Sequence, residues 1–539
     1  MNTTQRRYCG ILMHPTSLPG AYGIGDMGPE AYAFADYLAE SDVCLWQILP
    51  LGPTGFGNSP YAARSTFAGN ELLISLDKLR EDGLLEDSDL SSPPPFPCCG
   101  VDYSMVDAWK MPLLKKAARN FLATCGQHAS DYDAFCMENA FWLDDYAMFM
   151  VLYERYQDAR WFSVWDREIG DREPRALQDI MNRYGDQIEI RKVLQYFFER
   201  QWQELRSYVN GHGIKFIGDI PIFVAPDSVD TWSHIELFKT DEEGHYSAVS
   251  GVPPDCFSST GQLWGNPVYD WDAIKADGYA WWIQRIKRLL SQTDILRIDH
   301  FRGFDAYWEV PYGDKTAEHG TWVKAPGKEF FTIVRKELGQ LPILAEDLGF
   351  MTQSVEELRD SNGFPGMKVC QFGFSRDTAS WPNPFDMFLP HNYEYNSVAY
   401  TGTHDNDTTR GWYTKLSEDD RDMVRRYLAC NDHELVWAMI RAVMASHAKY
   451  AIFPMQDILD IGSEARMNVP STCGPHNWSW RMERKDYSQQ IAHRMSELVR
   501  IYARNGKSWQ ETEQEHLAQQ AAWRMERQKE RKEEAECEQ

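Results

Sequence analysis

Short apolar runs of strand type alternate along the chain with longer segments in which apolar residues recur at helical spacing. Continuous apolar runs separated by helical segments are typical of parallel strands that are buried on both faces. Eight such runs predict an α/β fold, a (β/α)8 TIM barrel. The runs are 9–13, 44–51, 214–224, 294–301, 341–348, 368–374, 397–405 and 450–459.

Helical segments fit between these runs and after them. The pattern predicts a barrel over residues 1–510, followed by a charged tail, 511–539, that forms a solvated helix. The segments with helical spacing between the apolar runs are 28–41, 276–291, 327–339 and 421–447.

Two connections are too long to be simple crossovers between strands. Residues 72–190 open with a PPPFP stretch and then have a helical pattern from Ala108 to Tyr156, so they predict a helical subdomain inserted after the second strand. Residues 225–275 follow the third run and are rich in Pro, Gly, Ser and aromatic residues. Long connections of this kind are usually functional, so we expect a loop region that overhangs the active face.

Composition narrows the classes of function. The 539 residues have a formal net charge of −25, which repels phosphate backbones and anionic lipids. Nucleic acid and membranes are therefore not expected partners, whereas a neutral ligand meets no such barrier. The 11 Cys include no C-x-x-C pair, and the N-terminus has no apolar stretch. We expect a cytoplasmic enzyme with free thiols and no metal or cofactor, and the oligomeric state stays open.

Four acidic residues each end one of the apolar runs. They are Asp219 in IKFIGD, Asp299 in ILRID, Glu346 in PILAED and Asp405 in AYTGTHD. An acid at the end of a buried strand is costly unless it faces an opening and has a partner. Four of them on separate strands predict one pocket lined with carboxylates. Paired carboxylates are what cleavage of a glycosidic bond requires.

The RIDHFRG stretch offers a nucleophile. Arg297 and Asp299 are two residues apart, so on a strand their side chains point to the same face. The guanidinium would hold the carboxylate ionised, as the nucleophile of a retaining glycosidase must be. A structural Arg–Asp pair at the end of a strand is the alternative.

The other acids offer an acid/base and sugar contacts. Glu346 ends an apolar run and is followed by Asp347, a setting that raises the pKa of a carboxyl group as a general acid needs. One of these two acids could instead cap a helix. The His404–Asp405 pair could grip two hydroxyls of one sugar ring, or form only a structural hydrogen bond. Asp219 could orient its neighbours or cap its strand.

Longer motifs carry these residues, and together they resemble a known family. The motifs are HPTSLPGAYGIGDMG (14–28), GPTGFGNSPYAARSTFAGN (52–70), GDIPIFV (218–224), GVPPDCFSSTGQLWGNP (251–267), LRIDHFRG (296–303), AEDLG (345–349), FPGMKVCQFGF (364–374) and TGTHDNDTTRGW (401–412). They resemble the 4-α-glucanotransferases of the amylomaltase, or disproportionating enzyme, type in glycoside hydrolase family 77. The resemblance implies a (β/α)8 barrel with inserted, largely helical subdomains and no C-terminal β-domain.

The resemblance also implies a reaction and roles. It implies transfer of an α-1,4-glucan segment to the 4-hydroxyl of glucose or another glucan, by retaining double displacement. Asp299 matches the nucleophile, Glu346 the acid/base and Asp405 the third carboxylate. A hydrolase with the same carboxylates and a glucan-binding barrel without activity are the alternatives. The residues implied to contact sugar are Tyr61, Ser59, Asp219, Asp255, Gln262, Trp264, Asn266, Arg297, His300, His404 and Asn468.

Overall fold

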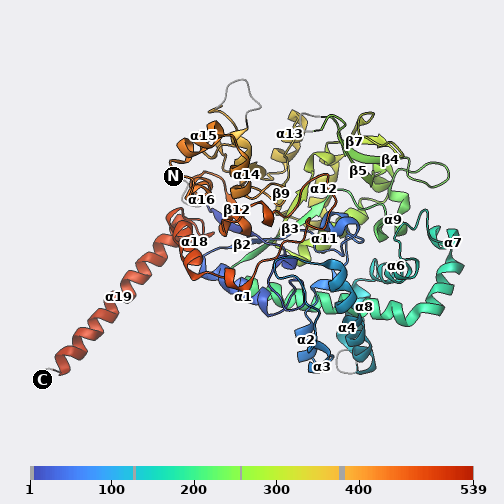
Figure 1. Cartoon of the computed structure of the whole chain (residues 1–539), viewed down its shortest axis with the longest axis horizontal. Coiled ribbons are helices and arrows are strands. Elements are labelled where there is room, and N and C mark those ends of the chain that lie inside the picture. Colours follow the sequence, from blue (N-terminus) through green and yellow to red (C-terminus); the bar gives the residue numbers. More distant parts are fainter. Residues whose placement is uncertain (1–4, 125–128, 255–257, 376–382, 538–539) are drawn as a thin grey trace.

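The computed structural model describes residues 5–124, 129–254, 258–375 and 383–537. Its centre is a closed barrel of parallel strands that follow one another in chain order (Figure 1), which confirms the predicted barrel. Six of the eight apolar runs contain a whole barrel strand, and the other two, 9–13 and 368–374, overlap a strand that begins one or two residues earlier. The barrel strands are β1 (Tyr8–Leu12), β2 (Leu45–Gln47), β3 (Lys215–Pro221), β6 (Ile295–Asp299), β9 (Ile343–Ala345), β10 (Gly366–Val369), β11 (Ser397–Tyr400) and β12 (Tyr450–Pro454).

Apolar side chains fill the barrel and set which strand residues face inward. One apolar cluster takes a residue from every barrel strand, which makes the interior a packed core. Because side chains alternate along a strand, Arg297 and Asp299 share the inward face with Ile295, whereas Leu296 and Ile298 pack outward in the main core. The cluster includes Leu12, Leu45, Ile217, Ile295, Leu344, Met367, Val398 and Ile452, one from each barrel strand in chain order.

Helices cover the outside of the barrel close to where the sequence predicts them. The predicted segment 421–447 forms two helices because Ala429, at the C-cap of the first, adopts the left-handed conformation (φ 51°). Apart from the tail helix at the end of the chain, the described α-helices outside the insertion after β2 are α1 (Pro29–Glu40), α9 (Val229–Ser233), α10 (Trp271–Ala276), α11 (Ala280–Gln292), α12 (Gly327–Leu338), α13 (Gln353–Ser361), α14 (Thr409–Lys415), α15 (Glu418–Leu428), α16 (Leu435–Ala445), α17 (Met455–Ile458) and α18 (Gln489–Ile501).

The connection after β2 is helical, and its last helix also belongs to the barrel. The boundary that we expect at residue 190 lies inside α8, which runs over 38 residues and kinks at Tyr184. Beyond the kink, Trp202 packs 4.9 Å from the ring of Phe216 on β3, so one helix serves both parts. The helices are α2 (Leu76–Glu81), α3 (Asp87–Leu90), α4 (Tyr103–Thr124), α5 (Ala129–Glu138), α6 (Leu143–Tyr156), α7 (Arg167–Gly170) and α8 (Pro174–Gly211).

The connection after β3 is more regular than the loop that we expect from its sequence. It contributes β4 (Ala248–Val252) and β5 (Gln262–Pro267) to a four-stranded antiparallel sheet of order β5-β4-β7-β8. Strands β7 (Ala306–Pro311) and β8 (Thr321–Lys324) come from the connection after β6. The sheet therefore joins two barrel loops, and the local pattern of either loop alone does not reveal this pairing.

The end of the chain is helical. The described residues after Trp480 form η11 (Arg484–Asp486), α18 and α19 (Trp509–Cys537), and they include no β-domain. Figure 1 shows α19, in red, extending away from the body of the protein. Among the helices that the structure describes, none combines the length and apolar character that crossing a bilayer requires.

Candidate active site

Strand register brings the predicted carboxylates together at the carboxyl end of the barrel. Asp219 pairs with Arg297 across β3 and β6, and Ile298 pairs with Ala345 across β6 and β9. Asp299 and Glu346, the next residues on those two strands, therefore leave the barrel side by side. This is the end of a (β/α)8 barrel at which active sites form.

Arg297 links two of the carboxylates. Its Nη1 donates to Asp219 Oδ2 at 2.6 Å and its Nη2 donates to Asp299 Oδ1 at 2.8 Å. Arg297 is 3% exposed, whereas the Asp299 side chain is 29% exposed, so Asp299 faces the opening. The contact expected from the two-residue spacing is present, and it orients a carboxylate beside a fixed positive charge.

Asp219 sits deeper and is held from two sides. Besides Arg297, the hydroxyl of Tyr61 donates to Asp219 Oδ2 at 2.7 Å. Burial raises the pKa of Asp219 to about 7, with the charge of Asp299 adding to the shift and Arg297 opposing it. Its position below the opening suits support of Arg297 and Tyr61.

Glu346 has the environment of a general acid. Its Oε2 accepts the backbone N–H of His300 at 2.7 Å, and its Oε1 accepts that of Leu348 at 2.9 Å. Burial, helped by the charge of Asp299 and opposed by Arg297 and the two amides, raises the pKa of Glu346 to about 8. Two neighbouring carboxyls in such different settings can divide the roles of acid and nucleophile.

The helix-cap alternative does not describe these acids. Asp347 Oδ1 accepts the backbone N–H of Met367 on β10 at 2.7 Å, and its Oδ2 pairs with Arg359 at 2.5 Å. Neither hydrogen bond is made to the first turn of a helix. Asp347 instead joins its loop to the neighbouring strand, which leaves the side chain of Glu346 for the opening.

Asp405 and its neighbours form the other side of the site. Asn468 Nδ2 donates to Asp405 Oδ1 at 2.7 Å, and His404 Nε2 lies 3.4 Å from Asp405 Oδ2. Burial lowers the pKa of His404, which favours a neutral imidazole. The ring of Tyr61 stacks on His404 with centroids 5.2 Å apart. The carboxylate of Asp405 thus stands beside rings that can pack on a sugar.

The comparisons with known proteins agree with this geometry. A family model described as glycoside hydrolase family 77, 4-alpha-glucanotransferase, matches residues 13–489. The chain belongs to this family.

Two relatives and one solved structure give the extent of the similarity. The chain is 49% identical over 504 residues to the 4-alpha-glucanotransferase of Synechocystis sp., over 93% of this chain and 98% of that relative. It is 42% identical over 509 residues to the chloroplastic/amyloplastic 4-alpha-glucanotransferase of Solanum tuberosum, over 93% and 87%. The amylomaltase from Streptococcus agalactiae in complex with acarbose matches with a TM-score of 0.88 at 41% identity, over 93% of this chain and 100% of that one.

The residues of β5 reach the same opening in this 4-alpha-glucanotransferase family member. Trp264 meets the ring of His300 edge to face at 4.7 Å, and its Nε1 lies within hydrogen-bond distance, 3.4 Å, of Gln262 Oε1. Asn266 Nδ2 donates to the carbonyl of Val224 at 2.8 Å, so it joins β5 to the segment after β3. Trp264 is 38% exposed and supplies a ring face beside the carboxyl end of β6, where Asp299 lies.

Of the residues that the resemblance implies contact sugar, Ser59 caps a turn, His300 is partly buried, and Asp255 lies outside the described residues. Ser59 Oγ accepts the backbone N–H of Tyr61 at 3.2 Å, so it caps the short turn that carries Tyr61. His300 adopts the left-handed conformation, and burial lowers its pKa to about 3.

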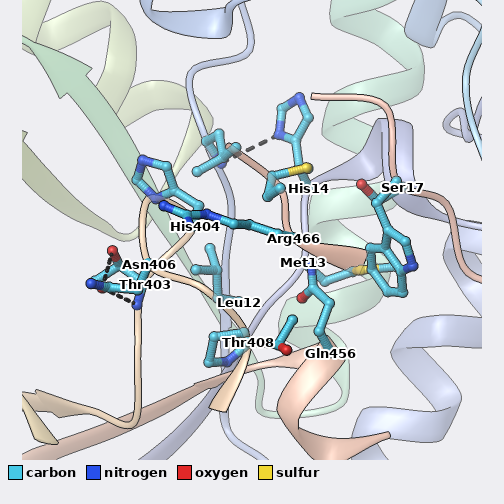
Figure 2. A pocket seen from close by; sticks show the side chains of 14 residues that line it. Leu12, Met13, His14, Ser17, Thr403, His404, Asn406, Thr408, Gln456 and Arg466 are labelled. Carbon is cyan, nitrogen blue, oxygen red and sulfur yellow. Dashed lines mark hydrogen bonds between the residues drawn. The ribbon is translucent and has the colours of Figure 1, made fainter. Parts of the chain in front are cut away.

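Two further residues shape the site of this family-77 chain without a sequence prediction. Arg466 Nη2 donates to the backbone carbonyl of Asp405 at 2.7 Å, and Figure 2 shows its side chain beside His404 at a cavity of about 20 Å³. The ring of Trp478 lies 5.8 Å from Tyr61 and 5.9 Å from His404. Arg466 precedes Asn468 in the same motif, which is the one signal that could have indicated it.

Proposed function

We propose that the chain transfers a segment of an α-1,4-glucan to the 4-hydroxyl of glucose or of another glucan, with retention at the anomeric carbon. The observation that carries this proposal is the pairing of an arginine-held carboxylate, Asp299, with a neighbouring carboxyl of raised pKa, Glu346. Membership of the 4-alpha-glucanotransferase family supports the transfer reaction. The cytoplasmic location and the absence of nucleic-acid and membrane partners stay predictions.

The first step forms a covalent glycosyl-enzyme. A carboxylate oxygen of Asp299 attacks the anomeric carbon of the donor, and the glycosidic bond breaks as Glu346 gives its proton to the departing oxygen. The backbone N–H groups of His300 and Leu348, which donate to the carboxyl of Glu346, keep it in one orientation. The leaving glucan carries a new 4-hydroxyl, and Glu346 is left ionised.

The second step releases the glycosyl group to an acceptor. Glu346, now a carboxylate, takes the proton of the acceptor's 4-hydroxyl, and that oxygen attacks the anomeric carbon. The bond to Asp299 breaks, so two inversions give net retention. Asp405 and His404 would grip ring hydroxyls, and Tyr61 would pack on the apolar face of the sugar beside the cleaved bond.

A hydrolase with the same carboxylates would differ only in the acceptor. Water would then replace the sugar hydroxyl in the second step. The exposed ring of Trp264 on β5, beside His300, supports an acceptor sugar at this position. A similar protein, the Streptococcus agalactiae amylomaltase, was solved in complex with acarbose, which supports a saccharide-binding cleft.

Incubation of the protein with maltotriose alone tests the proposal. We expect glucose together with a ladder of maltooligosaccharides longer than the substrate, because a second maltotriose accepts the glycosyl group. Separation of the products by chromatography is the measurement, and the Asp299→Asn protein supplies the blank. Glucose and maltose without longer products would identify a hydrolase, and unchanged maltotriose would identify a binding protein.

A further inference from the structure

Arg302 lies between the two loops that carry the proposed catalytic carboxyls. It belongs to the RIDHFRG motif, three residues after Asp299, and none of the roles described above involves it. Its residue is 6% exposed, in the short helix η7 (Phe301–Phe304) that follows β6. A nearly buried arginine at the rim of a site is costly unless its contacts fix something.

The contacts of Arg302 join three segments. Its Nη1 donates to the backbone carbonyl of Phe350 at 2.5 Å, in the loop between β9 and α13. Its guanidinium carbon lies 3.8 Å from the ring centroid of Trp322 on β8. The planar guanidinium can stack on the ring and donate in its own plane at the same time, which a lysine ammonium cannot do.

The two residues joined by the hydrogen bond from Arg302 to Phe350 each follow, by two residues, an amide that donates to Glu346. One amide on its carboxylate belongs to His300, two residues before Arg302, and the other belongs to Leu348, two residues before Phe350. Gly349, next to Leu348, has a φ of 94° and no side chain that could fix the loop by packing. Arg302 therefore bridges the two segments that supply the amide donors.

We propose that Arg302 is a positioning residue for the acid/base carboxyl, because it fixes the distance between the backbone amides of His300 and Leu348 that donate to Glu346. Stacking on Trp322 keeps the guanidinium in place. It also connects the two segments that hold Glu346 to the four-stranded sheet that overhangs the barrel. This inference rests on the proposed function and adds a residue that acts through Glu346 without contact to the sugar. The charges that act most on Glu346 are those of Asp299 and Arg297, and the contacts of Arg302 with Phe350 and Trp322 involve neither of them.

The test replaces Arg302 with methionine and compares it with a matched arginine. Arg335 on α12 also donates to a loop carbonyl, that of Asn362 at 3.1 Å, but lies in an exposed position. With maltotriose we expect kcat of Arg302→Met to fall about 100-fold and KM to change less than about threefold, because only aimed proton transfer is lost. Arg335→Met should match the unchanged protein.

Two readouts separate positioning from a general loss of structure. Loss of amide donors disfavours the ionised form of Glu346, so the alkaline limb of kcat/KM should move to higher pH in Arg302→Met. Arg302→Lys keeps the charge and should show the same displacement. Release of fluoride from α-maltosyl fluoride needs no proton from Glu346, so its first-turnover rate should stay within about fivefold of the unchanged protein.

The outcomes decide the inference independently of the proposed function. Equal losses with maltotriose and maltosyl fluoride, an unmoved pH limb, or a full kcat in Arg302→Met would each overturn it. If Arg302→Met fails to fold, Trp322→Leu removes the stacking ring from the edge strand and should give the same pattern more weakly. Failure of the unchanged protein to form the maltotriose ladder would instead contradict the proposed function.

Discussion

Replacement of Asp299 by asparagine is expected to slow glucan transfer by about 10⁴-fold or more, while glucan still binds. An amide is too weak a nucleophile to form the glycosyl-enzyme. Its oxygen can still accept from Arg297, so the shape of the site is kept. Initial rates with maltotriose measure the loss, and calorimetric titration with a longer maltooligosaccharide measures binding.

The control for this prediction is Asp179→Asn, which makes the same change at an exposed position on α8. It should leave both rate and affinity unchanged. If Asp299→Asn kept more than about 1% of the transfer rate of the unchanged protein, another carboxylate would have to be the nucleophile, because loss of a covalent nucleophile lowers the rate far more than that. A parallel loss of binding would make Asp299 a binding residue only.

Replacement of Glu346 by glutamine is expected to lower the rate with maltotriose by about 10³-fold or more. Glutamine cannot protonate the departing oxygen, but it keeps the size of the side chain. Fluoride leaves without that proton, so the first turnover with α-maltosyl fluoride should be nearly unchanged. Rapid-quench measurement of fluoride release separates the two donors, and Glu394→Gln, at an exposed site, is the control.

The pH dependence gives the same residue a second signature. The first step needs protonated Glu346, and burial raises the pKa of this carboxyl to about 8, so the rate with maltotriose should fall as the pH rises through that value. Glutamine does not titrate, so this alkaline limb should be absent from the first step of Glu346→Gln. Equal slowing with both donors, or an alkaline limb that persists, would assign the proton to a different group.

The barrel and the group of carboxyls at its strand ends could be predicted because both leave a local signal. A parallel strand that is buried on both faces forms an unbroken apolar run, and an acid at its end contrasts with that run. The two-residue spacing of Arg297 and Asp299 directly predicts their contact, which the structure contains. The tail helix α19 follows from its dense charge and helical pattern in the same way.

Features that depend on distant partners could not be predicted. Strands β4 and β7 pair although they belong to two different connections of the barrel, after β3 and after β6. The Pro and Gly residues near β4 are typical of a loop, so the local sequence alone does not indicate a strand there. The apolar pattern of α8 continues past residue 190 because the helix changes neighbours without ending. Asp347 resembles a helix cap in sequence but accepts from Met367 on a neighbouring strand.

The most direct test mixes the Glu346→Gln protein with α-maltosyl fluoride and measures the mass of the protein by mass spectrometry. Fluoride departure allows the first step, and the second step lacks its base, so a glycosyl-enzyme should accumulate. The account predicts a mass increase of one maltosyl group, which peptide mapping assigns to Asp299. A protein of unchanged mass, or a maltosyl group on another carboxylate such as Asp219 or Asp405, would contradict it.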